Sequence, residues 1–150
     1  MDNLSSIWWE DGKMLLTKLS GDVGICEIQI WENCLKDALN QIADNSKFKM
    51  FVNLFGFKAD SVEAHKYYRS IIPTTLSHYG WRIGYLDMFE EANDLELTNT
   101  RGISCVGAAH VHQDASKIDK YQELYATDRE QYFTDPDQAY HWIEDLSLDG

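Results

Sequence analysis

The most continuous run of hydrophobic residues in this chain extends from Phe48 to Phe57. Its first eight residues are apolar except for Lys49 and Asn53, and the run is too short and too aromatic for a typical surface helix. Apolar runs of this length are typical of strands that helices cover on both faces of a parallel sheet. The pattern therefore predicts a central buried strand here.

The residues before this strand predict a hairpin and a helix. Asp11-Gly12 separates two apolar-rich segments, 7–10 and 13–19, and Asp-Gly supplies the positive backbone angles of a tight hairpin turn. Further on, apolar side chains recur at helical spacing and predict a helix over about 25–43. These side chains are Ile28, Trp31, Cys34 or Leu35, Ala38, Leu39 and Ile42.

The residues after the central strand alternate between helical and extended patterns. We expect a second helix from the cap at Asp60 or Ser61 to Gly80, with a kink at Pro73, and then a strand over 82–88. A short strand over 130–134 follows later. The pair Asp135-Pro136 then starts a last helix, because it offers an acidic cap and a proline at the first helical position.

The segment 100–126 has two readings. Residues 105–111 fit a strand, but the helical spacing after Asp114 also extends backward, and two glycines and several alanines do not decide between them. We favour one long helix that is irregular near Gly107. On a strand His110 and His112 would share a face, whereas on a helix His110 and Asp114 would.

These elements predict one α/β domain over residues 1–150. Alternating strands and helices favour parallel strands joined by right-handed crossovers, and the opening hairpin adds an antiparallel edge. The expected architecture is a mixed sheet of about five strands, packed with about four helices.

Charge and cysteine content narrow the classes of partner. The chain has 13 basic and 25 acidic residues, a net charge of −12, which disfavours nucleic acid and anionic membrane surfaces. No apolar run is long enough to span a bilayer, and the first residues do not resemble a secretion signal. Three cysteines without metal-type spacing are typical of reduced thiols, so we expect a cytoplasmic protein.

The layout and the last third of the chain resemble the SpoIIAA-like fold of STAS domains and of uncharacterised bacterial proteins of that class. The residues that carry the closer likeness are 109–114 (AHVHQD), Lys117-Ile118, Tyr121, 128–136 (DREQYFTDP), Ala139 and Trp142-Ile143. The resemblance implies a binding or regulatory module rather than an enzyme. It also implies that related folds hold lipids or nucleotides.

Regulatory STAS domains carry a phosphorylated serine after the central strand, and Ser61 lies at about that place. The usual Asp-Ser-Ser-Gly stretch is absent, because this chain has Asp60-Ser61-Val62-Glu63. A helix N-terminus favours a phosphate, but Glu63 would repel one. Capping of the helix is therefore the preferred role for Ser61, with phosphorylation as the alternative.

Three groups of side chains are candidates for a binding site. His110, His112 and Asp114 would ligate a transition metal if they lay on a strand, and a hydrogen-bonded histidine and acid is the simpler alternative. Adjacent Trp8 and Trp9 would face opposite sides of an edge strand, and an exposed one would mark an interface. Aromatic residues would line a ligand pocket between sheet and helices. The aromatic candidates are Phe55, Phe57 and Tyr85.

The sequence thus favours a non-enzymatic cytoplasmic interaction module that docks a protein partner or forms a homodimer through the hairpin edge. We find no nucleophile elbow, P-loop or dinucleotide-binding pattern, so no catalytic residue and no cofactor is predicted. The first alternative is a small-molecule or lipid carrier with the aromatic pocket. The second is a metal-dependent enzyme that uses the two histidines and Asp114.

Overall fold

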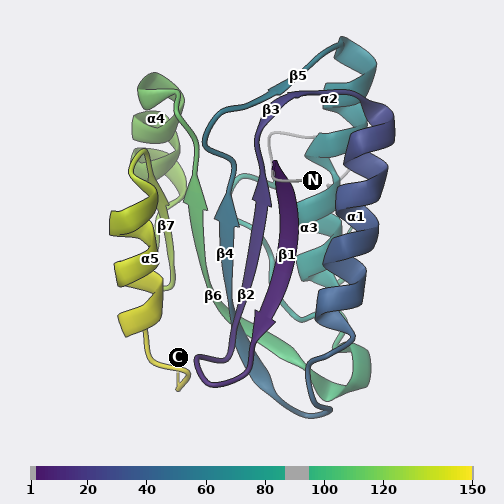
Figure 1. The fold of residues 1–150 in the computed structure, drawn as a ribbon. Coiled ribbons are helices and arrows are strands. Elements are labelled where there is room, and N and C mark those ends of the chain that lie inside the picture. Colours follow the sequence, from purple (N-terminus) through teal and green to yellow (C-terminus); the bar gives the residue numbers. More distant parts are fainter. Residues whose placement is uncertain (1–2, 87–94, 150) are drawn as a thin grey trace.

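The computed structural model describes residues 3–86 and 95–149, which form a mixed five-stranded sheet with helices on both sides (Figure 1). The strand order is β1-β2-β4-β6-β7. β1 pairs antiparallel with β2, and all the other neighbours in this sheet are parallel. The predicted parallel sheet with an antiparallel edge hairpin is therefore confirmed. The strands are β1 (Leu4–Trp9), β2 (Met14–Leu19), β4 (Lys47–Asn53), β6 (Ser104–Val111) and β7 (Glu130–Phe133).

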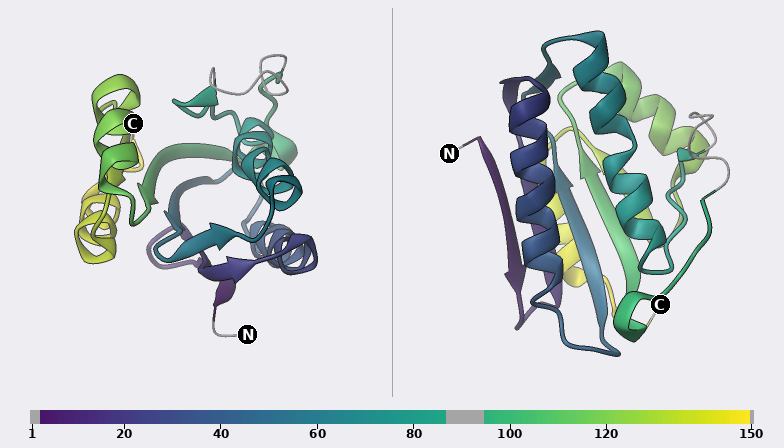
Figure 2. Two further views of the ribbon diagram at one scale, coloured as in Figure 1. Left: turned by 90° about the horizontal axis from the view of Figure 1, so that it is seen from above. Right: turned by 90° about the vertical axis from the view of Figure 1, so that its right-hand side faces the viewer.

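The helices divide into two groups, which Figures 1 and 2 show on different sides of the sheet. α1 (Ile25–Leu39), α2 (Val62–Arg69) and α3 (Ile71–Ser77) lie on one side. α5 (Pro136–Asp145) packs on β4, β6 and β7 from the other side, whereas α4 (Ala115–Tyr125) packs on Tyr132 of β7, on the face of that strand turned away from α5. A two-stranded ribbon of β3 (Gly21–Val23) and β5 (Phe57–Ala59) and a short 3-10 turn at Thr100–Gly102 complete the described elements.

β4 is the buried central strand that its apolar run predicts, although it ends at Asn53. Its side chains alternate between two cores, as the pleat requires. Phe48, Met50 and Val52 pack into the core beneath α1–α3, whereas Phe51 packs with α5. The later part of the apolar run leaves the sheet, and Phe57 begins β5.

The prediction of one long helix over 100–126 is wrong, because residues 104–111 form β6 and α4 begins only at Ala115. β6 pairs with β4 on one side and β7 on the other, which satisfies its backbone groups without a helix. The glycine and alanines of β6 let neighbouring elements pack closely against the strand and do not form a helix. A side chain at Gly107 would collide with Leu146, so the glycine lets the chain that follows α5 approach the sheet closely.

Two other local predictions are wrong. The hairpin turn places the positive φ angle at Lys13 (50°) and not at Asp11-Gly12, and Gly12 is required because a Cβ there would collide with the Trp9 ring. Residues 82–86 form no strand, and residues 87 and 88 of that predicted strand lie outside the described part.

Other boundaries confirm the prediction. The second helix breaks at Ser70, between α2 and α3, as Pro73 requires, because its ring excludes the carbonyl four residues earlier from a helical hydrogen bond. Asp135 caps α5 by accepting a hydrogen bond from the backbone N–H of Asp137, with Pro136 in the first turn.

Lys49 is a buried cation on the α5 side of β4, with only 4% of its surface exposed. Its Nζ donates hydrogen bonds to the carbonyl oxygens of Glu144 (2.8 Å) and Leu146 (2.9 Å). The last carbonyls of a helix lack partners within it, so this ammonium group fixes the C-terminal end of α5 to the central strand.

We expect Lys49→Met to lower the free energy of unfolding by about 1–3 kcal/mol, because the carbonyls at the end of α5 lose their donor. Lys47→Met is the matched control, since Lys47 is exposed on the same strand and should change stability by less than about 0.5 kcal/mol. Urea denaturation measures both values. Equal effects of the two substitutions would contradict this role of Lys49.

Candidate functional site

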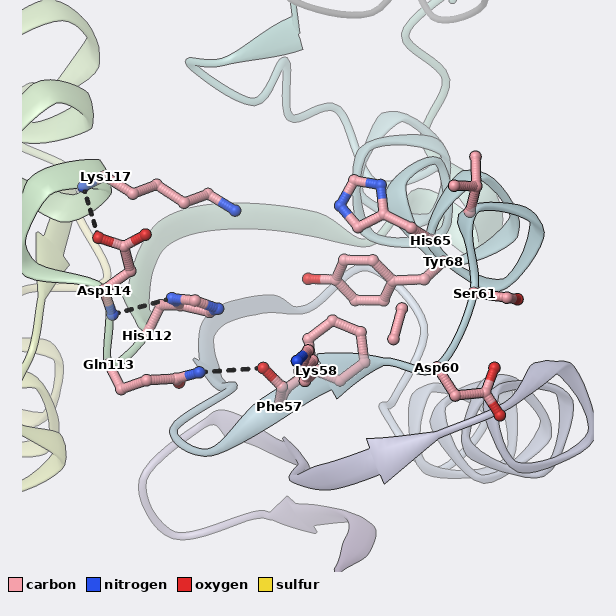
Figure 3. Close-up of a pocket in the computed structure, with 12 residues that line it drawn as sticks. Phe57, Lys58, Asp60, Ser61, His65, Tyr68, His112, Gln113, Asp114 and Lys117 are labelled. Atoms are coloured by element: carbon pink, nitrogen blue, oxygen red, sulfur yellow. Dashed lines mark hydrogen bonds between the residues drawn. The ribbon is translucent and has the colours of Figure 1, made fainter.

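A cleft lies beyond the C-terminal ends of β4 and β6, between the N-terminal ends of α2 and α4 (Figure 3). Open parallel sheets commonly bind ligands at this edge, because loops from neighbouring strands diverge there. We call its wide part, about 650 Å³, the outer cleft. The outer cleft is lined by residues 57–62, 65, 68, 112–114 and 117.

A deeper hollow of about 200 Å³, which we call the inner chamber, adjoins the outer cleft. The two share the side chains of His65, Tyr68, His112 and Lys117, so one ligand can occupy both. The inner chamber lies above β6, between α2 and α4. Its deeper lining consists of Leu54, Arg69, Tyr85, His110, Val111, Ile118, Tyr121 and Tyr132.

Three basic side chains meet where the two spaces join. Figure 3 shows Lys117, His65 and His112 pointing into the cleft around the hydroxyl group of Tyr68. Within the described residues, the Lys117 ammonium forms no ion pair or hydrogen bond, and it lies over the Tyr121 ring, 5.6 Å from the ring centroid. The nearby Asp114 carboxylate caps α4 by accepting from the Lys117 backbone N–H (3.2 Å).

The surroundings of these groups disfavour their positive charge. Burial lowers the pKa of Lys117, and Asp114 only partly opposes this. Burial, followed by the charge of Lys117, lowers the pKa values of His65 and His112. Cations that are desolvated and repel one another are stabilised when an anion binds among them.

Two helix N-termini add to the positive potential of the cleft. Ser61 caps α2 by accepting from the Ala64 N–H (3.1 Å), and Asp114 caps α4. The N-terminal end of a helix carries a partial positive charge, which favours an anion nearby. This positive region lies in a protein whose net charge is −12.

The inner chamber is mainly aromatic. The Tyr85 ring lies 5.4 Å from that of Tyr121, 6.3 Å from that of Tyr132 and 5.8 Å from that of His110. Burial raises the pKa values of Tyr68, Tyr85 and Tyr132, so these phenols stay neutral at physiological pH. The chamber therefore offers flat apolar surfaces with a few polar ends.

His110 and Glu130 form a buried pair at the base of the chamber, with 2.8 Å between Nε2 and Oε2. Glu130 also accepts hydrogen bonds from the backbone N–H of Gly84 (2.9 Å) and from the Trp81 indole (3.5 Å). The His110 ring stacks on Tyr132, with centroids 4.8 Å apart. The buried Tyr132 hydroxyl has no partner among the described residues, which costs about 1–3 kcal/mol.

The predicted aromatic pocket is found in part. Phe57 lines the outer cleft and Tyr85 lines the inner chamber, but Phe55 lines neither and is 48% exposed. Phe55 lies in the turn between β4 and β5, whereas the sequence suggested that the central strand reached it.

The structure does not arrange His110, His112 and Asp114 as a metal site. His110 pairs with Glu130, the Asp114 carboxylate caps α4, and His112 Nδ1 accepts from the Asp114 N–H (3.1 Å). Across residues 3–86 and 95–149, no three histidine, cysteine, aspartate or glutamate side chains lie close enough to hold a metal ion. His112 lies after the end of β6, where the strand alternation that suggested a shared face no longer applies.

Trp8 and Trp9 face opposite sides of β1, as predicted. Trp8 packs edge-on against Phe48 in the core beneath α1, whereas Trp9 joins the core on the α5 side.

Ser61 is the cap of α2, as preferred, and its phosphorylation stays a prediction.

The sequence pattern does not mark His65, Lys117, Glu130 or Tyr132 as site residues. Only Glu130 stands out in the sequence. It is an acidic residue at the start of a short strand that is buried on one face and ends in Tyr132-Phe133. The others are ordinary helix or strand residues whose proximity depends on the crossover connections.

No protein-family model matches this chain, and no curated protein or solved structure matches it significantly. No helix in the described part of the chain has the length and apolar character needed to cross a membrane. The resemblance to STAS domains remains a prediction.

We expect the two cleft histidines to destabilise the protein as pH falls. Their lowered pKa values mean that the unfolded chain, with a histidine pKa near 6.5, binds protons more readily than the folded one, so stability is lost as pH falls below 6.5. Thermal melts from pH 8 to 5 should show a smaller decrease for His65→Asn/His112→Asn than for wild type. Parallel curves would contradict the pKa assignment.

Proposed function

We propose that this protein is a binding module for a small organic anion. The acidic group of the ligand would lie among Lys117, His65 and His112, and its apolar body would enter the inner chamber. The observation that carries this proposal is the meeting of three partly desolvated basic side chains at the mouth of an aromatic chamber, where the Lys117 ammonium has no ion-pair partner among the described residues.

The dimensions of the chamber limit the ligand. Pockets for drug-sized ligands measure about 300–1,000 Å³, and the inner chamber, at about 200 Å³, fits a smaller apolar body such as a single ring. The outer cleft leaves room for a longer polar portion. A phospholipid with long acyl chains is a poorer fit to a chamber of this size.

Binding without chemistry is the simpler role for these residues. Burial raises the pKa of the Cys105 thiol to about 12, so this cysteine is not a reactive nucleophile. The Ser61 hydroxyl is used as a helix cap. The likeness of the layout to the SpoIIAA-like fold supports the same choice, because STAS domains are mostly regulatory modules, and we infer a cytoplasmic regulatory or carrier role.

We expect Lys117→Gln to weaken benzoate binding about tenfold, because a charge-assisted contact contributes about 1.5–3 kcal/mol. The matched control is Lys120→Gln, since Lys120 lies on the same helix, is exposed and does not line the cleft. Calorimetric titration of the three proteins measures the affinities. Benzoate binding that is unchanged by Lys117→Gln would overturn the proposed site.

A second candidate function, docking of a protein partner or of a second copy, is favoured by an apolar surface on the α5 side of the hairpin. Ile7 is 58% exposed there, with Trp9 and Leu16 half-buried beside it. β1 is the last strand of the described sheet, so its outer edge offers unpaired backbone groups to another strand. We propose a homodimer through this edge, as the sequence suggested.

This proposal predicts that Ile7→Lys lowers the fraction of dimer, because a charge would be buried against the partner. Ile30→Lys is the matched control, since Ile30 is 41% exposed on α1, away from this surface. Light scattering across a concentration series measures the oligomeric state. A wild-type protein that stays monomeric at high concentration would refute the homodimer.

A further inference from the structure

We infer that the ligand of the inner chamber is an aromatic acid that carries a hydroxyl group at the end remote from its acidic group. This inference rests on the proposed function, which places the acidic group beside Lys117. It adds the chemical class of the ligand, from two polar atoms on the lining residues His110 and Tyr132 that have no hydrogen-bond partner among the described residues.

The first of these atoms is Nδ1 of His110. Glu130 binds the other ring nitrogen, Nε2, and an ionised carboxylate only accepts hydrogen bonds, so Nε2 carries the hydrogen. In a neutral imidazole Nδ1 is then an acceptor. Nδ1 makes no hydrogen bond within the described residues, and His110 lines the chamber.

The second atom is the Tyr132 hydroxyl oxygen, which is buried and has no hydrogen-bond partner in the described part of the chain. Parallel pairing of β6 and β7 sets Tyr132 beside His110, with the two rings stacked and nearly parallel (14°). A hydroxyl group is the simplest ligand group that fits both, because it donates to a histidine nitrogen and accepts from a phenol.

The walls between these atoms and the chamber mouth favour an aromatic ring. Tyr85 and Tyr121 have their rings tilted by 35° to each other, and Tyr68 lines both the chamber and the outer cleft. Aromatic faces pack well against a planar ring in offset or edge-on arrangements. The ligand class is therefore a hydroxylated one-ring acid, such as a hydroxybenzoate or a hydroxycinnamate.

Calorimetric titration of wild type with matched pairs of acids tests this inference. The pairs are benzoate with para-hydroxybenzoate, and cinnamate with para-hydroxycinnamate, which differ in length. The hydroxyl group should raise the affinity about tenfold in the pair whose length fits, because it fills two unsatisfied hydrogen-bonding groups. The absorption band of para-hydroxycinnamate should also move to longer wavelength as its phenol donates to His110.

Tyr132→Phe is the informative variant, since it removes only a hydroxyl group that forms no bond within the described structure. It should reduce the gain from the ligand hydroxyl by several fold. Tyr125→Phe is the matched control, because Tyr125 lies on α4 outside the chamber lining.

The possible outcomes separate the two proposals. If the unsubstituted acids bind through Lys117 but the hydroxyl adds nothing, the ligand class is wrong and the anion site stands. Equal weakening of both members of a pair by Tyr132→Phe would also overturn the ligand class, because the hydroxyl would then have only a structural role. If none of the four acids binds, the proposed function fails, and this inference fails with it.

Discussion

The Glu130 carboxylate is the group on which the candidate site depends. It is 2% exposed, and a carboxylate this deeply buried is tolerated only when several donors surround it. Its donors come from His110 on β6 and from Trp81 and Gly84 in the segment after α3. The Glu130 side chain therefore links three parts of the chain: its own strand β7, the neighbouring strand β6, and the segment after α3. That last segment contributes Tyr85 to the wall of the inner chamber.

The alternation of β6 explains why the two sides of the sheet differ. Gly107, Ala109 and Val111 point toward α5, and these small residues let α5 and the following chain close against the strand. Ala108 and His110 point the other way. There α2 and α4 stand apart above the strand, and the space between them is filled only partly, by tyrosine rings, which leaves the inner chamber.

Much of the fold could be predicted because local patterns agree with it. The apolar run around Met50 and the caps at Ser61 and Asp135 specify their elements without help from distant residues. β6 could not be predicted, because its glycine and alanines have no clear period and its strand conformation depends on pairing with β4 and β7.

The site was harder to predict than the fold, because its residues come from distant parts of the chain. His65 lies on α2, between β4 and β6, whereas Lys117 lies on α4, between β6 and β7. No sequence spacing therefore relates the two residues. The sequence did single out His110 and His112, but as metal ligands. Nothing in the sequence indicated that Glu130 is the acid that binds His110. Glu130 lies on β7, the strand that pairs with β6, and only this pairing brings the two side chains together.

The charge distribution shows why such a cleft would act through short-range contacts. A net charge of −12 repels an anion at a distance, so long-range attraction cannot supply the binding energy. At physiological ionic strength this repulsion is largely screened beyond about 8 Å, whereas contacts to partly buried cations are screened much less. Salt would thus weaken the long-range repulsion more than the attraction within the cleft, so the ligand would have to be selected by the chemistry of the cleft and the chamber rather than by its charge alone.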